Sequence, residues 1–74
     1  TDLTPVEAFA MIIKAEFRPF SRFDWRAFAG CKSEKPYIAY YDGYVLVWDN
    51  DVVEIVHMND DHCGQVFILS DANA

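Results

Sequence analysis

The sequence has little that would carry it into or across a membrane. Its longest uninterrupted apolar run is six residues, from Ala8 to Ile13, whereas a membrane-spanning helix needs ~20. No basic segment followed by an apolar stretch opens the chain, as a secretory signal would require. Two cysteines, Cys31 and Cys63, are too few for a disulfide framework. We therefore expect a cytoplasmic protein with no membrane partner.

The sequence is also poor in the residues from which enzymes build a site. Its three glycines, Gly30, Gly43 and Gly64, are dispersed and form no glycine-rich phosphate-binding loop. Cys63 follows His62, but adjacent residues seldom give a nucleophile and its base the required geometry, and no third group accompanies them. We expect no catalytic residue, no cofactor and no enzymatic activity.

Basic residues are absent from the second half of the chain. All six Lys and Arg precede position 36, whereas seven Asp and Glu lie between Pro36 and Ala74, and the net charge is −6. Direct binding to nucleic acid needs clustered Lys and Arg, so this half is not expected to provide it. An acidic half of this kind either keeps an aromatic-rich protein soluble or attracts a partner protein with a basic surface.

Two helices are expected near the start of a single domain that covers residues 1–74. Thr4 as N-cap, Pro5 and Glu7 predict where the first helix begins, and Pro19 ends it. A second helix is predicted over residues 22–29, with Ser21 as its N-cap and Gly30 as its stop. The buried stripe of the first helix is predicted to consist of Val6, Phe9, Ala10, Ile13 and Phe17.

From residue 37 onward the apolar pattern changes to the period of a β-strand. Strands are predicted over residues 37–41, 44–48, 52–57 and 65–69. Asp42-Gly43 between the first two is a strong signal for a hairpin with a two-residue type I′ turn. The expected fold class is α+β, with the two N-terminal helices packed on one face of a four-stranded antiparallel meander sheet.

Both faces of this predicted sheet are mostly apolar, which is unusual for an antiparallel sheet with one wet side. If the turn after residue 48 holds three residues, Glu54 lies on the aromatic face; a two-residue turn at Asn50-Asp51 moves it to the other. The first helix is expected to cover the aliphatic face, which consists of Ile38, Val45, Val47, Val53 and Ile55.

The aromatic face is then closed by the short helix, the C-terminal segment or a homodimer partner, or it serves as a docking surface with an acidic rim. On the docking interpretation, the residues expected to contact a partner are Asp49, Asp51, Glu54, Trp48, Tyr44, Tyr41, Tyr37 and Asp42.

One further cluster contains the side chains that bind zinc: His57, Asp60, Asp61, His62 and Cys63. Their spacing matches no established metal-binding pattern, so a polar surface connection is the preferred interpretation and no metal site is predicted. Asp49-Asn50-Asp51 likewise lacks the glycine and the late glutamate of a calcium loop.

These patterns favour a small acidic interaction protein without catalytic activity, which occludes a basic or nucleic-acid-binding surface of a partner protein. Inhibitors and anti-defence factors of mobile elements or phages, and mimics of nucleic-acid charge, are of this kind. The alternative is a homodimeric α+β module that binds a small ligand at the seam between two aromatic sheet faces.

Overall fold

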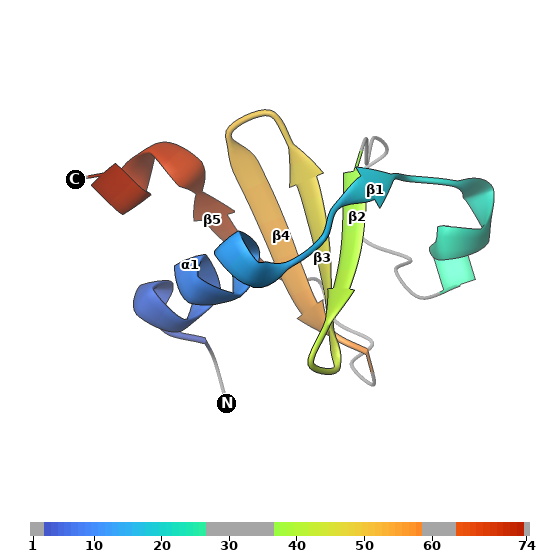
Figure 1. Ribbon diagram of the computed structural model, residues 1–74, viewed down its shortest axis with the longest axis horizontal. Coiled ribbons are helices and arrows are strands. Elements are labelled where there is room, and N and C mark those ends of the chain that lie inside the picture. Colours follow the sequence, from blue (N-terminus) through green and yellow to red (C-terminus); the bar gives the residue numbers. More distant parts are fainter. Residues whose placement is uncertain (1–2, 27–36, 59–63, 74) are drawn as a thin grey trace.

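A computed structural model describes residues 3–26, 37–58 and 64–73 of the chain. The fold is mixed α+β, and its strands form one antiparallel sheet in the order β1-β2-β3-β4-β5 (Figure 1). Each strand therefore lies beside its neighbour in sequence. The elements are α1 (Pro5–Lys14), β1 (Arg18–Pro19), the 3-10 helix η1 (Arg22–Arg26), β2 (Tyr37–Tyr41), β3 (Tyr44–Asp49), β4 (Val52–His57), β5 (Gln65–Ile68) and the 3-10 helix η2 (Leu69–Asn73).

This architecture differs from the expected one in two respects. The described part of the chain contains one α-helix and five strands, whereas two helices and four strands were predicted. The second predicted helix is a five-residue 3-10 helix, and its predicted part beyond residue 26 lies outside the described residues. The additional strand, β1, pairs Arg18 with Ile38 and Pro19 with Tyr37. Proline is tolerated there because an edge strand leaves one row of N–H groups unpaired.

The start of α1 is as predicted. Thr4 Oγ1 accepts a hydrogen bond from the backbone N–H of Glu7, and Glu7 Oε1 accepts one from the backbone N–H of Thr4, which completes a capping box. The helix ends at Lys14, before the expected stop at Pro19, because Ala15 already adopts an extended conformation. The chain can then run extended into β1.

The first hairpin is confirmed in turn and register, and β3 extends one residue beyond the predicted end, to Asp49. Tyr37 lies opposite Trp48, and Tyr41 lies opposite Tyr44. Asp42 and Gly43 have φ values of 50° and 81°, as a type I′ turn requires. Both residue types tolerate positive φ, which explains why this turn could be predicted from two residues.

The second hairpin has the two-residue turn, so the three-residue alternative was wrong. Asp49 lies opposite Val52 and Trp48 lies opposite Val53, while Asn50 adopts a φ of 57°. Because successive side chains alternate between the two faces, this register places Glu54 opposite Val47, on the face away from the tryptophan.

Helix α1 covers the aromatic face, which corrects the expectation that it would cover the aliphatic one. Ala8 and Met11 pack with Ala39, Leu46 and other residues of that face. Trp48 and Phe67 are partly buried beside them. The predicted buried stripe of α1 was also wrong, since Val6 and Ile13 are exposed. The helix is apolar on nearly every side, so its sequence alone did not determine which side faces the sheet.

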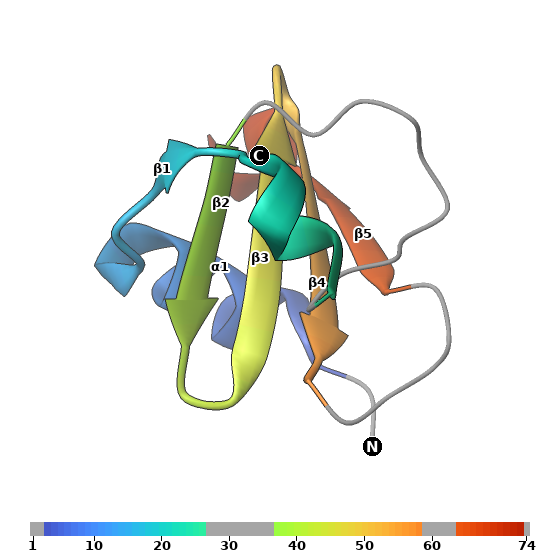
Figure 2. The same ribbon diagram turned by 90° about the vertical axis from the view of Figure 1, so that its right-hand side faces the viewer.

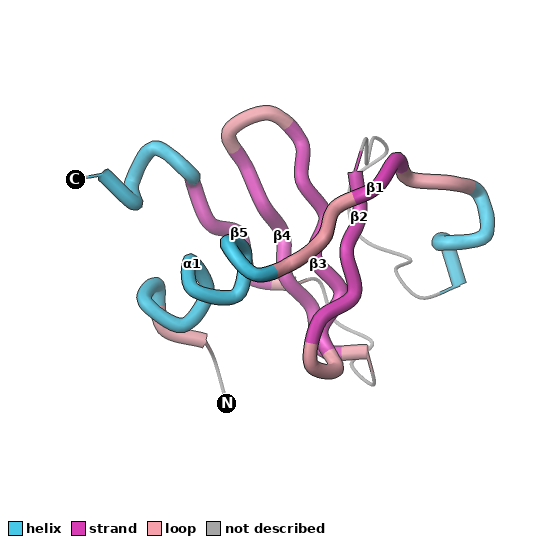
Figure 3. Tube along the Cα trace, viewed as in Figure 1, coloured by secondary structure: helices cyan, strands magenta, loops and turns pink. Residues whose placement is uncertain are grey.

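The other face forms a second, smaller cluster of Ile38, Val45, Val47 and Val56, with Phe20 packed against it. Figure 2 shows η1 in front of β3 on this side. Helices therefore lie on both sides of the strands, with α1 and η2 on one side and η1 on the other (Figure 3). Both apolar faces have a structural cover, which explains the lack of a polar face in the sequence.

Candidate interaction surface

Three carboxylates gather at one end of the sheet, where β3 ends and β4 and η2 begin. We call Asp49, Asp51 and Asp71 the acidic end. Asp51 Oδ1 accepts from the backbone N–H of Ser70 at 3.0 Å, and Oδ2 accepts from its hydroxyl at 2.8 Å. These bonds hold η2 beside the turn between β3 and β4, and so bring Asp71 next to it. Sequence reasoning missed Asp71, because its position depends on the path of β5.

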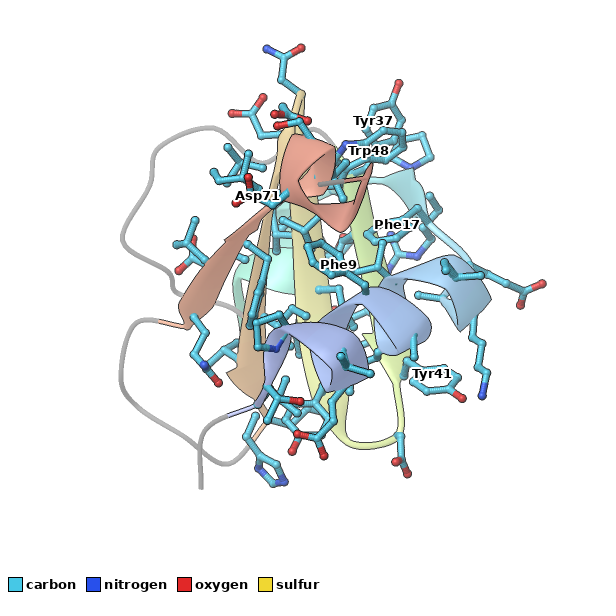
Figure 4. The ribbon with its side chains drawn as sticks, turned by 90° about the vertical axis from the view of Figure 1, so that its left-hand side faces the viewer. Phe9, Phe17, Tyr37, Tyr41, Trp48 and Asp71 are labelled. Carbon is cyan, nitrogen blue, oxygen red and sulfur yellow. The ribbon has the colours of Figure 1, made fainter. Side chains whose placement is uncertain are left out.

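Two aromatic side chains stand at the same end. The rings of Tyr37 and Trp48 are 5.3 Å apart between centroids, and Phe17 meets the indole edge-on at 5.6 Å. The indole N–H donates to the backbone oxygen of Asn50, which fixes its orientation. The side chain of Tyr37 remains 43% exposed. In Figure 4 both rings lie together at the end of the sheet where Asp71 is also found.

No cation compensates the acidic end within the described residues. Among the described residues the ion pair that forms is Arg18–Asp24, at 2.6 Å, and it lies at the β1 side of the sheet rather than at the acidic end. Asp51 has neutral donors as partners, and Asp71 is exposed. Asp49, Asp51 and Asp71 thus place three negative charges around this end of the sheet, and none of the three forms an ion pair with another described residue. Such a concentration of charge favours the approach of cations.

The remaining predicted contact residues lie elsewhere. Asp42 and Tyr41 are at the opposite end of β2, roughly 13 Å from Tyr37 at the rise of a β-strand. Tyr44 is there too, with its ring edge-on to His57 at 5.2 Å. Glu54 is buried on the face away from α1 and accepts from the backbone N–H of Gly64 at 3.2 Å. The eight predicted residues therefore do not form one patch. Those that lie at the acidic end are Asp49, Asp51, Tyr37 and Trp48, and strand alternation puts Asp49 on the opposite face of the sheet from the two rings.

Asp24 carries the most strongly perturbed titration among the described groups. The Arg18 guanidinium holds the pKa of the Asp24 carboxyl well below its usual range, with help from hydrogen bonds donated by Ser21 and Tyr40. The carboxylate is buried and ties η1 to β1 and β2. In the sequence Asp24 is marked only by its place three residues after Ser21, the predicted N-cap, which does not indicate a buried carboxylate. Asp24 therefore has a structural role, which we call the Asp24 latch: its carboxylate is hydrogen-bonded only to donors of the same chain and holds η1 against the sheet.

No group of three or more metal-ligating side chains gathers among the residues that the structure describes. Of the zinc-type cluster, His57 is described, whereas Asp60, Asp61, His62 and Cys63 lie outside the described residues. Cys31 lies outside them as well. Within the same ranges, no helix combines the length and apolar character needed to cross a bilayer.

Comparisons with known proteins identified no relative of this chain. No protein family matches the chain, and no curated protein or solved structure matches it significantly.

Proposed function

We propose that this protein is a small, acidic, non-catalytic interaction protein that binds a basic surface of another protein and occludes it. The acidic end makes the contact, and Tyr37 and Trp48 form its apolar centre. The surface it covers is one that otherwise binds nucleic acid. In this role the protein acts in the cytoplasm as an inhibitor or a mimic of nucleic-acid charge, as products of mobile elements and phages do.

The observation that carries this proposal is the coincidence of unpaired charge and an ordered aromatic pair at one end of the molecule. Carboxylates steer an oppositely charged partner toward the site and set the rate of encounter. Aromatic side chains supply contact area, and they are enriched where interfaces hold their binding energy. The Trp48 ring is already fixed by Phe17, Tyr37 and the backbone of Asn50. Little side-chain entropy is therefore lost when a partner binds.

Arginine is the residue on the partner that this arrangement fits best. A guanidinium group stacks on an aromatic face and forms paired hydrogen bonds with a carboxylate, whereas a lysine ammonium does neither as well. Tyr37 offers a partly exposed ring, whereas Asp49 lies on the other face of the sheet and Asp71 lies across η2 from the ring (Figure 4), so several arginines of a partner would share these groups. Arginine-bearing surfaces are also those that contact phosphate groups.

The test compares two variants that lose the same number of charges, one within the acidic end and one outside it. Asp49→Asn/Asp71→Asn removes two charges from the acidic end. Asp42→Asn/Glu16→Gln removes two exposed charges elsewhere, and asparagine tolerates the positive φ of position 42.

Asp51 stays unchanged in both variants, because its carboxylate holds Ser70 and its loss would disturb η2. Each protein is immobilised, exposed to host lysate, eluted with rising salt and analysed by mass spectrometry. The retained protein is then purified and its affinity for each variant is measured.

We expect one basic protein to be retained by the wild type and by the control variant, and to be released as salt rises. Exposed ion pairs contribute about 0.2–1 kcal/mol each, so the acidic-end variant should bind about 2-fold to 30-fold more weakly. Duplex DNA or RNA should compete for the same partner. Equal losses in both variants would reduce the effect to net charge, and retention that is insensitive to salt would contradict the proposal.

A further inference from the structure

The outward side of α1 is apolar, although it faces solvent. Val6 is 80% exposed and Ile13 is 83% exposed, and Ala10 between them is exposed as well. These positions are four and three residues apart, which places them on one stripe of a helix. The residues that face the sheet, Ala8 and Met11, lie on the opposite side. Figure 4 looks onto this side of the molecule, where α1 crosses the sheet as the outer layer.

Single exposed hydrophobic residues are common on soluble proteins, but this stripe repeats along the length of one helix. The stripe also lies apart from the acidic end. In Figure 4, α1 crosses the lower part of the sheet, whereas Asp71 and Trp48 lie near its upper end. A partner for the stripe must present an apolar helix-sized surface with suitably placed charges.

Two charged residues flank the stripe on the same side. Glu7 and Lys14 are seven residues apart, or about two helical turns, and so project in nearly the same direction. Glu7 Oε1 accepts hydrogen bonds from the backbone N–H and the hydroxyl of Thr4, and neither of these bonds involves Oε2. Hydrogen bonding by Thr4 holds the pKa of Glu7 below its usual range, so this side chain is ionised at neutral pH.

These positions complement themselves when two copies of α1 pack in antiparallel fashion about a two-fold axis near Ala10. Val6 of one copy then lies opposite Ile13 of the other, and Glu7 lies opposite Lys14. Antiparallel pairing brings the same flank of each helix together, so both ion pairs form on one side of the seam. The small side chain of Ala10 at the centre permits close approach of the two helix axes.

We propose that a second copy of this chain docks on the outer face of α1, forming a symmetric dimer through antiparallel helix pairing. A two-fold interface uses the same patch twice, which is the property that the pairs Val6–Ile13 and Glu7–Lys14 provide. The dimer leaves both acidic ends free, so this inference does not rest on the function proposed above. A contact between two ten-residue helices falls below the ~1,200 Å² of stable complexes, and the dimer is therefore weak.

The first experiment is sedimentation equilibrium over a concentration series from about 10 µM to 1 mM, a range suited to weak interfaces. The wild type should shift from monomer to dimer, and no further. Ile13→Gln removes an exposed apolar side chain while keeping a good helix former. The loss occurs twice in the dimer, so association should weaken at least about tenfold. Val66→Thr, which removes an exposed apolar side chain from β5, is the matched control and should leave association unchanged.

The second experiment tests the antiparallel register through charge. Lys14→Glu places two acids on the flank, and Glu7→Lys places two bases there, so each variant should lose self-association through repulsion. An equimolar mixture should recover it, because each acidic residue then faces a basic one. Circular dichroism of each variant confirms that the helix is retained after the capping box is altered.

A wild type that stays monomeric across the series would overturn the inference. So would a dimer that Ile13→Gln leaves intact and Val66→Thr weakens, because the interface would then lie on β5. Failure of the mixed charge variants to associate, with dimerisation of the wild type intact, would exclude the antiparallel pairing. None of these results changes the binding of an arginine-bearing partner to the acidic end, so the two proposals fail separately.

Discussion

Replacement of Asp24 by asparagine tests how the cover over the second sheet face is held. Both carboxylate oxygens of Asp24 act only as acceptors. Oδ1 accepts from Arg18 Nη2 at 2.6 Å and from the Tyr40 hydroxyl at 2.8 Å. Oδ2 accepts from Arg18 Nη1 at 3.0 Å, and from the backbone N–H and the hydroxyl of Ser21 at 2.8 Å and 3.0 Å. Five donors therefore converge on one buried group.

An asparagine cannot satisfy this arrangement in either orientation. With its NH₂ in the place of Oδ2, it would face the backbone N–H of Ser21, which can only donate. With its NH₂ in the place of Oδ1, it would face an Arg18 nitrogen, which also only donates, although the Tyr40 hydroxyl can turn to accept. The second orientation is the better one, and it loses the paired bonds to the guanidinium.

The expected cost is about 2 kcal/mol, because hydrogen bonds to a charged group contribute about 1.5–3 kcal/mol. At about 4–8 °C per kcal/mol for a domain of this size, the Tm should fall by roughly 8–16 °C. Thermal unfolding followed by circular dichroism measures this shift. Asp71→Asn is the control, since Asp71 is exposed, and its effect should stay within about 0.5 kcal/mol.

Tyr40→Phe completes a double-mutant cycle with Asp24→Asn. In the wild-type background the loss of this hydroxyl should cost about 1 kcal/mol, since it donates to a buried carboxylate. In the Asp24→Asn background the cost should shrink by at least half, because the two side chains are in contact. Additive effects, or an Asp24→Asn protein as stable as Asp71→Asn, would refute the latch.

Three further predictions concern the same fold. The pKa of Asp24 is lower in the folded protein than in the unfolded chain, so this group stabilises the fold fully above the unfolded carboxyl pKa of about 4 and progressively less as the pH falls below it. The wild-type Tm should therefore drop between about pH 5 and pH 2, and the Tm of Asp24→Asn should drop less. Gly64→Ala should destabilise the protein by about 1–3 kcal/mol in urea unfolding, because a Cβ there would lie 2.4 Å from the backbone oxygen of Ile55. Thr4→Ala should cost about 1 kcal/mol in the same assay, since it removes the N-cap of α1.

Local signals in the sequence predicted local structure correctly. The limits of β2 and β4, the Asp42-Gly43 turn and the capping box at Thr4 all depend on residues within a few positions of one another. Each rests on a backbone preference or a short-range hydrogen bond that is almost independent of the rest of the chain. The order β2-β3-β4 follows from two-residue connections of the same local kind.

The choice of which sheet face α1 covers could not be predicted, because it depends on long-range packing. Seven of the ten residues of α1 are hydrophobic, so several stripes offer apolar surface. The register after Asn50 hinged on one turn residue, and a one-residue change moves every later side chain to the other face. The predicted contact residues are divided between the two ends of the sheet and its η1 side, because their grouping assumed that Glu54 lies on the aromatic face and that this face stays open.

Because α1 covers one face of the sheet and the η1 segment covers the other, few surfaces of this small molecule remain for binding a partner. Burying both faces of the sheet places most of its aliphatic residues in the interior, including Leu46 in one cluster and Val45 in the other. The chain then has only the rims of the sheet and the backs of its helices with which to meet a partner. Among the described residues, the acidic end concentrates unpaired charge on one rim, and the Val6–Ile13 stripe leaves apolar surface on one helix. Electrostatic attraction weakens with salt whereas apolar burial does not. Rising salt should therefore weaken binding at the acidic end more strongly than association through the stripe, whose apolar centre is retained when its flanking Glu7–Lys14 pairs are screened.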